Sequence, residues 1–260
     1  MDTLTRQQGR HFIVTGAGSG IGRAIAHRLA SEGAVLTLLG RDVFKLQSVA
    51  EELRAKDATV HLGQCDVRDR ERVLAEIARG AEVLGPVHGC IANAGVGGSN
   101  YPGAGDRWDD VVRTNLDGTY YTLRAAERHL ASGPSTRHFV VISSILGRIG
   151  VPGYTAYCAA KTGLLGLVRA MAMELAPLDV QVNAVCPGWV NTDMAWSGID
   201  GIAQAKGIPR EQALKEEMAA VPMGRMSEPA DVAGLVAWLV SKDARGVTGQ
   251  AIDMNGGAWM

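Results

Sequence analysis

A tyrosine, a lysine and a serine in one stretch of this chain have side chains suited to moving a proton. Tyr157 and Lys161 lie four residues apart, and Ser144 lies thirteen residues before Tyr157. Residues four apart share one face of a helix, so the phenol and the ammonium can converge on one reacting atom. A nearby ammonium lowers the pKa of a tyrosine from its ordinary value of about 10, which allows proton exchange near neutral pH. A packed aromatic ring beside a solvated charge would have the same spacing.

A glycine-rich segment lies between the first expected strand and the first expected helix. Glycines allow a tight turn and the close approach of a pyrophosphate, and the helix N-terminus adds N–H donors and a favourable dipole. After the first strand of an α/β chain, this pattern indicates a dinucleotide site. The segment reads Thr15-Gly16-Ala17-Gly18-Ser19-Gly20-Ile21-Gly22.

Apolar, strand-like runs alternate with helical patterns along the chain, which is typical of a parallel sheet covered on both faces. The pattern predicts a single doubly wound, Rossmann-like α/β domain over residues 1–260, with about seven strands and ligands beyond their carboxyl ends. The expected strands are 11–15, 34–39, 59–63, 87–92, 137–143, 180–185 and 250–253. The expected helices are 21–32, 43–56, 70–82, 108–132, 154–176 and 229–240.

One segment, about residues 191–226, interrupts this alternation after the sixth strand. It contains large apolar side chains, several glycines and a helical patch over 211–220. A long insertion at the carboxyl end of a strand predicts a substrate lid. A surface excursion without a role is the alternative.

Composition narrows the class of protein. The chain has 260 residues, 47% of them hydrophobic, and a net charge of −1, so we expect no nucleic-acid partner and no polybasic membrane patch. No apolar run is long enough for a membrane span, and residues 1–10 lack a signal-peptide core; we expect a cytoplasmic protein. The four cysteines form no CxxC pair and the six histidines no HExxH motif, so we expect no metal site.

Taken in order, these motifs resemble the short-chain dehydrogenase/reductase family of single-domain enzymes, over roughly residues 10–258. Its 3-oxoacyl reductase, hydroxyacyl dehydrogenase and secondary-alcohol dehydrogenase members are the nearest in pattern. The shared marks are the glycine-rich segment with TGxxxGxG spacing, Asp66, Asn93-Ala94-Gly95, Asn115, Ser144, the Tyr157–Lys161 pair and Pro187-Gly188.

The resemblance implies a catalytic set of Asn115, Ser144, Tyr157 and Lys161. Tyr157 would exchange a proton with the substrate oxygen while hydride moves to or from the nicotinamide. Ser144 would hold that oxygen, Lys161 would lower the pKa of the tyrosine and bind the nicotinamide ribose, and Asn115 would position a water beside the lysine. We give Ser143 no catalytic role, because alternate residues of a strand face opposite sides.

The resemblance also implies the residues that bind the cofactor. The glycine loop would line the pyrophosphate, Asp66 would accept from the adenine amine or cap the next helix, and Thr192 would reach the carboxamide. The full expected set is Gly16, Ser19, Gly20, Ile21, Gly22, Arg41, Asp66, Val67, Asn93, Ala94, Gly95, Tyr157, Lys161, Pro187, Gly188, Val190 and Thr192.

The residue at the end of the second strand indicates whether the protein prefers NADP(H) or NAD(H). An acidic residue there would bind the ribose hydroxyls and repel a 2′-phosphate, but this chain has Gly40 followed by Arg41 and Asp42. An arginine without that carboxylate favours NADP(H). Asp42 either caps the helix starting at residue 43 or binds the ribose, and in the second case NAD(H) would be the cofactor.

The expected substrate pocket consists of Val96, Ser144, Leu146, Tyr154, Trp189, Met194 and Trp196. Large apolar side chains there predict a bulky hydrophobic or aryl ketone or alcohol, although some could simply pack the lid against the body. A 3-oxoacyl thioester is equally compatible with the family.

Two other kinds of protein share part of this pattern with an oxidoreductase. Nucleotide-sugar epimerases or dehydratases have a TGxxGxxG loop and a longer substrate domain, and this chain has neither. A non-catalytic dinucleotide sensor or structural subunit would not need the serine, phenol and ammonium. The resemblance further implies a homotetramer or homodimer through 108–132, 154–176 and 250–260.

Overall fold

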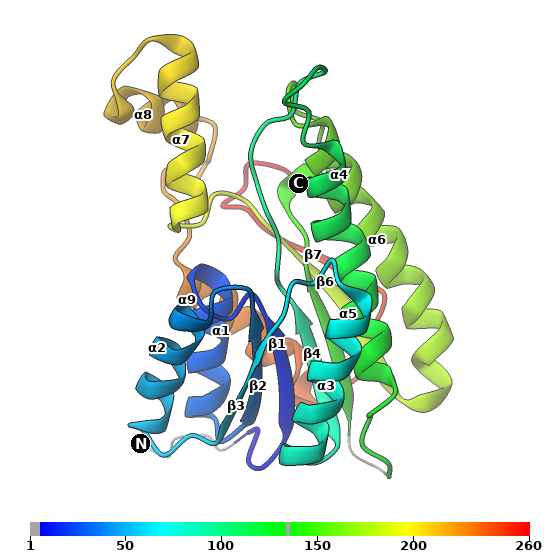
Figure 1. The fold of residues 1–260 in the computed structure, drawn as a ribbon. Helices are drawn as coiled ribbons and strands as arrows, with labels where there is room; N and C mark the ends of the chain where they lie inside the picture. The colour runs from blue at the N-terminus through cyan, green and yellow to red at the C-terminus, as the bar shows by residue number, and fades with distance from the viewer. Residues whose placement is uncertain (1–5, 134–135) are drawn as a thin grey trace.

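The protein is built around one parallel sheet whose seven strands lie in the order β3-β2-β1-β4-β5-β6-β7 (Figure 1). The computed structural model describes residues 6–133 and 136–260; the first part of the N-terminal segment considered above lies outside them. The strands are β1 (His11–Thr15), β2 (Val35–Gly40), β3 (Val60–Gln64), β4 (Val87–Ala92), β5 (Arg137–Ile142), β6 (Val180–Pro187) and β7 (Ala251–Met254). The predicted doubly wound α/β fold is confirmed.

Helices cover both faces of the sheet because alternate strand residues point to opposite sides. Phe12 and Val14 of β1 join one buried apolar cluster, whereas Ile13 joins the other. The first cluster packs under α1 (Gly20–Ser31), α2 (Val43–Arg54) and α9 (Pro229–Leu239). The second packs under α3 (Arg70–Leu84), α5 (Gly118–Glu127) and α6 (Thr155–Leu175). The strand order reverses between β1 and β4, where folds of this class bind ligands.

The single helix expected over residues 108–132 is wrong. The structure has α4 (Trp108–Val112), a π-helical turn η1 (Arg113–Asp117) and then α5, which ends at Glu127. Beyond it the chain turns, and Leu130 bridges to Val87. A π-helical turn inserts an extra residue into the helix and often marks a functional site, and this one contains Asn115.

The segment between β6 and α9 forms two helices, α7 (Asp193–Lys206) and α8 (Arg210–Ala219). In Figure 1 they stand away from the sheet, beyond the carboxyl end of β6. They have a small apolar cluster of their own that includes Ile199, Ala213 and Met226. The sequence predicted only the second helix, because Gly198 and Gly201 lower the helix propensity of the first; Thr192 caps α7 by accepting from Ala195 N at 3.3 Å.

Across residues 6–133 and 136–260, the structure contains no helix whose length and apolar character would let it cross a membrane.

Candidate active site

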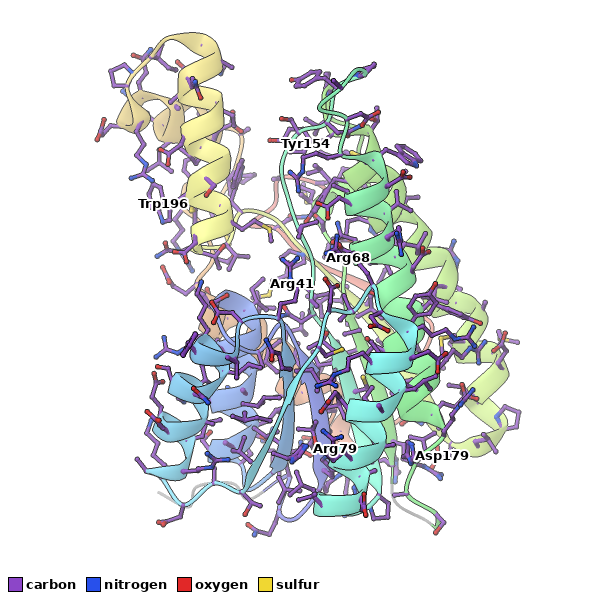
Figure 2. All side chains as sticks on the ribbon, in the orientation of Figure 1. Arg41, Arg68, Arg79, Tyr154, Asp179 and Trp196 are labelled. Atoms are coloured by element: carbon purple, nitrogen blue, oxygen red, sulfur yellow. The ribbon has the colours of Figure 1, made fainter. Side chains whose placement is uncertain are left out.

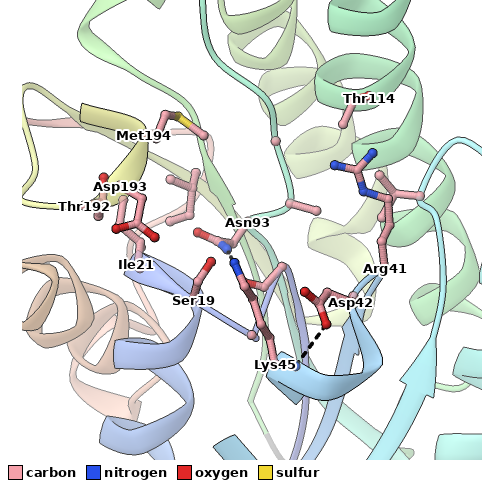
Figure 3. A pocket seen from close by; sticks show the side chains of 18 of the residues that line it. Ser19, Ile21, Arg41, Asp42, Lys45, Asn93, Thr114, Thr192, Asp193 and Met194 are labelled. Carbon is pink, nitrogen blue, oxygen red and sulfur yellow. Dashed lines mark hydrogen bonds between the residues drawn. The ribbon is translucent and has the colours of Figure 1, made fainter. Parts of the chain in front are cut away.

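A cavity of about 350 Å³ opens at the carboxyl ends of the strands, within the usual range for ligand sites of about 300–1,000 Å³. Figure 3 shows its lining, contributed by the glycine loop, the ends of β2, β4 and β5, helix α6 and the start of α7. The catalytic serine, tyrosine and lysine expected from the sequence all line it. Gly16 and Met194, 178 positions apart in the chain, therefore line one cavity.

The glycine loop is shaped for a close approach of a ligand. Gly16 and Gly20 have φ angles of +64° and +51°, a region that side chains disfavour. A Cβ on Gly22 would overlap the carbonyl oxygen of Gly16 and stand 2.6 Å from Asn93 Nδ2. The loop could not keep this path with larger residues, and its backbone opens onto the start of α1. These features fit the pyrophosphate of a dinucleotide.

Two cations and a carboxylate line the cavity where β2 ends and α2 begins. Asp42 is occupied as the N-cap of α2, since its Oδ1 accepts from Lys45 N at 3.1 Å (Figure 3). Arg41 and Lys45 both line the cavity, and Lys45 lies across Gly18 of the glycine loop. The sequence interpretation missed Lys45; its position one turn into the helix that follows Arg41 was the available signal.

Asp66 is turned toward Arg68 rather than into the cavity. Its carboxylate accepts from Arg68 Nε at 3.1 Å and Nη2 at 2.7 Å, and these bonds from Arg68 lower the pKa of Asp66. Arg68 also reaches Asp110 of α4 at 2.9 Å. Figure 2 places Arg68 and Arg41 at the same end of the sheet, opposite Arg79 and Asp179. Both acceptor oxygens of Asp66 are thus engaged, whereas neighbouring Val67 lines the cavity.

The end of β4 is fastened to the end of β1. Thr15 Oγ1 accepts from the backbone N–H groups of Asn93 and Ala94, each at 3.0 Å. Asn93 Nδ2 donates to Thr15 O at 2.9 Å. Asn93 is therefore a brace for the backbone of the first strand.

Lys161 is buried, with 4% of its surface exposed. Its Nζ donates to Ile142 O at 2.8 Å and stands 5.5 Å from the centroid of the Tyr157 ring. Burial lowers the pKa of Lys161 to about 8 because it penalises the charged form. Ser143 also lines the cavity, but its hydroxyl donates to Lys161 O at 2.9 Å, so it braces the backbone of α6.

The expectation of a lowered tyrosine pKa does not hold here. Burial raises the pKa of Tyr157 to about 12, and the hydrogen bond with Ser144 opposes that rise. The ammonium of Lys161 is held at the Ile142 carbonyl, 5.5 Å from the centroid of the ring, and burial of the phenol sets the direction of the shift. Ser144 is itself oriented, since its Oγ accepts from Leu146 N at 3.1 Å.

Asn115 lies behind the reacting groups. Its Oδ1 accepts from Val96 N at 2.8 Å and its Nδ2 donates to Val96 O at 2.9 Å. A Cβ on Gly95 would stand 2.9 Å from Asn115 Oδ1 and 3.7 Å from Lys161 Nζ, so the amide and the ammonium converge on this glycine. Asn115 itself does not line the cavity, although its neighbour Thr114 does.

Most of the expected cofactor residues face the cavity. Gly22, Asp66, Gly188 and Val190 do not line it: Gly188 packs on Asn255, and Val190 bridges to Ser227. Those that line it are Gly16, Ser19, Gly20, Ile21, Arg41, Val67, Asn93, Ala94, Gly95, Tyr157, Lys161, Pro187 and Thr192.

The expected substrate residues are more dispersed. Ser144 and Met194 line the cavity. Trp189 and Trp196 pack with the apolar cluster of α7 and α8, and Trp196 also lies under Arg210, 4.8 Å from its guanidinium carbon. Figure 2 shows Tyr154 at the start of α6 and Trp196 on α7. The pocket stays a prediction.

Comparison with known proteins supports this arrangement. A family model described as "Enoyl-(Acyl carrier protein) reductase" matches residues 16–258. A putative ketoacyl reductase of Streptomyces coelicolor is 36% identical over 260 residues, covering 98% of each chain. The structure of an actinorhodin polyketide ketoreductase variant with NADPH has a TM-score of 0.89 and 36% identity, over 96% of this chain and 97% of that one. Carveol dehydrogenase from Mycobacterium avium in complex with NAD has a TM-score of 0.91 and 30% identity, over 97% and 98%.

Proposed function

This chain belongs to the short-chain dehydrogenase/reductase family, and we propose that it reduces 3-oxoacyl thioesters with NADPH. The family relationship establishes the reaction class, an NAD(P)-dependent interconversion of a ketone and an alcohol. The non-catalytic sensor has no support among these relatives. The observation that carries the proposal is the convergence of Ser144, Tyr157 and Lys161 on one cavity with the glycine loop.

The residues present fit a dinucleotide. The positive φ angles of the glycine loop and its bare backbone suit a pyrophosphate. The cofactor supplies the hydride chemistry when bound, and the protein supplies geometry and proton transfer.

In the proposed reaction, Tyr157 donates its phenolic proton to the ketone oxygen as that oxygen gains charge. Ser144 holds the same oxygen, and its own Oγ is oriented by Leu146 N. Lys161 stabilises the resulting phenolate, since an ammonium 5.5 Å from the ring centroid favours its charged form. Asn115, next to Gly95 and Lys161, holds the path by which the tyrosine regains a proton.

The preference for NADPH rests on Arg41 and Lys45. Both cations line the adenosine end of the cavity, where a 2′-phosphate would form charge-assisted hydrogen bonds. Of the carboxylates near these cations, Asp42 is engaged as a helix cap and Asp66 is paired with Arg68. Gly40 occupies the position at which an acidic residue would bind the ribose and favour NAD.

The thioester substrate is inferred from the relatives and from the segment at about 191–226. One relative is described as a ketoacyl reductase, and the matching family model refers to an acyl carrier protein. We propose that α7 and α8 act as the substrate lid of a single catalytic domain. Met194, in the first turn of α7 and 3.0 Å from the position of a Cβ on Gly97, would contact the acyl chain.

A steady-state assay at the nicotinamide absorbance band tests the proposal. The purified protein is given 3-oxoacyl, 2-enoyl and cyclic-ketone substrates with NADPH or NADH. We expect the highest kcat/KM for a 3-oxoacyl thioester with NADPH. A preference for the cyclic ketone or the enoyl thioester would overturn the proposed substrate, and a preference for NADH would overturn the proposed cofactor.

Two variants locate the phosphate preference. Arg41→Ala and Lys45→Ala should each raise the Kd for NADPH about tenfold, the effect of losing one charge-assisted hydrogen bond of about 1.5 kcal/mol, and leave the Kd for NADH unchanged. Arg23→Ala, which removes an exposed cation paired with Glu52, is the control. An equal loss of affinity for NADPH and for NADH would contradict a phosphate-binding role.

We also propose a homo-oligomer located in the cytoplasm. Trp108, Tyr120 and Met173, on α4, α5 and α6, are exposed by 44%, 41% and 79%, and an exposed apolar face is typical of an interface. Sedimentation should give a dimer or tetramer; a monomer at micromolar concentration would reject this.

A further inference from the structure

Helix α6 carries Tyr157 and Lys161, yet its own N-terminal residue does not cap it. Tyr154 occupies the N-cap position and its side chain makes no hydrogen bond to the first turn. Such a first turn leaves backbone N–H groups without partners within the helix and tends to fray. Tyr157 is the third residue of α6, so fraying would displace the phenol directly.

The cap comes from Asn100, in the loop between β4 and α4. Its Oδ1 accepts from Ala156 N at 2.9 Å and lies 3.2 Å from the Thr155 hydroxyl. Its backbone N–H donates to Gly153 O at 2.8 Å, and its Nδ2 donates to Asp106 Oδ1 at 3.2 Å. Only 6% of Asn100 is exposed, so water cannot readily replace these bonds.

The same loop is held by the π-helical turn. Four residues before Asn100, the backbone of Val96 forms two hydrogen bonds with the side chain of Asn115. The loop therefore connects the turn that carries Asn115 to the first turn of the helix that carries Tyr157. Its position and the position of the phenol depend on each other.

We propose that Asn100 is a positioning residue for the reaction: by capping α6 from the β4–α4 loop, it holds Tyr157 in place relative to Ser144 and Asn115. Asn100 does not line the cavity, so it acts through Tyr157 and does not touch the cofactor. This inference rests on the proposed acid–base role of Tyr157.

Asn100→Ala removes the acceptor for the Ala156 N–H. We expect kcat to fall about ten- to a hundredfold, the scale on which misplacing a reacting group acts, while the Kd for NADPH, followed by its fluorescence, changes less than about threefold. The pH profile of alcohol oxidation should move to higher pH, because the hydrogen bond with Ser144 lowers the pKa of Tyr157 and a displaced phenol would lose it.

Asn100→Asp keeps the acceptor for the Ala156 N–H but places a second carboxylate against that of Asp106. The double variant Asn100→Asp with Asp106→Asn removes one of the two opposed charges, keeps the acceptor for the Ala156 N–H, and leaves an amide oxygen at position 106 for the Trp108 N–H. We expect the single change to lower kcat and the double variant to restore it to within about threefold of wild type. This pair also decides the question if Asn100→Ala does not fold.

Asp69→Ala is the matched control, because Asp69 caps α3 by accepting from Arg72 N at 3.0 Å and lies outside the cavity. It should lower the Tm as Asn100→Ala does and leave kcat unchanged. An unchanged kcat in Asn100→Ala, an equal loss in Asp69→Ala, or no rescue in the double variant would each overturn the positioning role.

All variants are compared on the simplest ketone that the wild type reduces. If the wild type reduces that ketone but no 3-oxoacyl thioester, the proposed substrate fails and the comparison at Asn100 still holds. If Tyr157→Phe keeps its activity, the proposed acid–base role fails instead.

Discussion

Acid should destabilise this protein through a histidine buried at the end of the sheet remote from the active site. His138 lies in β5, beside Gln181 of β6, with 1% of its surface exposed. Among the described residues, neither of its ring nitrogens has a hydrogen-bond partner. Burial, with a smaller contribution from the charge of Arg10, lowers the pKa of His138 from 6.5 to about 3.

The sign and size of the effect follow from proton linkage. Below pH 6.5 the unfolded chain binds a proton at His138 that the folded protein rejects, so stability falls as the pH falls from about 6.5 toward about 3. Each unit of pKa difference is worth about 1.4 kcal/mol. Between pH 6 and pH 4 this histidine alone should remove about 2–3 kcal/mol from the free energy of unfolding.

Urea unfolding at several pH values between 4 and 7 measures this contribution. His138→Gln, which cannot be protonated, should flatten the dependence by about 1 kcal/mol per pH unit relative to wild type. His129→Gln, two residues beyond the end of α5, is the control for the change of a histidine to glutamine. Equal slopes for His138→Gln and wild type would refute the reasoning, because the proton would then not bind preferentially to the unfolded chain at this residue.

Three further substitutions test the site. Tyr157→Phe should lower kcat by about 10²–10⁴-fold, the contribution of a positioned proton donor, while NADPH still binds in a fluorescence titration; substantial turnover would contradict the mechanism. Gly22→Ala should raise the Kd for NADPH at least about tenfold, because its Cβ would overlap Gly16 O. The control for it is Gly166→Ala, where a Cβ meets nothing within 4 Å, and equal Kd values in the two variants would argue against a tight cradle. Asp42→Ala should cost about 1 kcal/mol in unfolding free energy by removing the α2 cap and leave the NADPH/NADH ratio of kcat/KM unaltered; a marked change in that ratio would assign Asp42 to the ribose.

The pattern of the chain was sufficient for the strands and for most helices. A run such as Phe12-Ile13-Val14 between turn residues can only be buried on both sides, which requires a parallel sheet under two layers of helices. Where the prediction failed, a tertiary contact had overridden local propensity. The helix expected from residue 108 is interrupted at Asn115, whose amide pairs with the backbone of Val96, and no local pattern encodes that pairing.

The sequence by itself determined the chemistry, because the glycine spacing and the Ser144, Tyr157 and Lys161 types are properties of short segments. It also determined which end of each strand would carry the site. Only the tertiary structure decided how these groups are tuned: burial of Tyr157 and Lys161, the engagement of Asp66 by Arg68, and the capping of α6 by Asn100. The dielectric surroundings and the hydrogen-bond partners of these groups come from residues that are distant in the chain. Those residues come close to one another only when the chain folds.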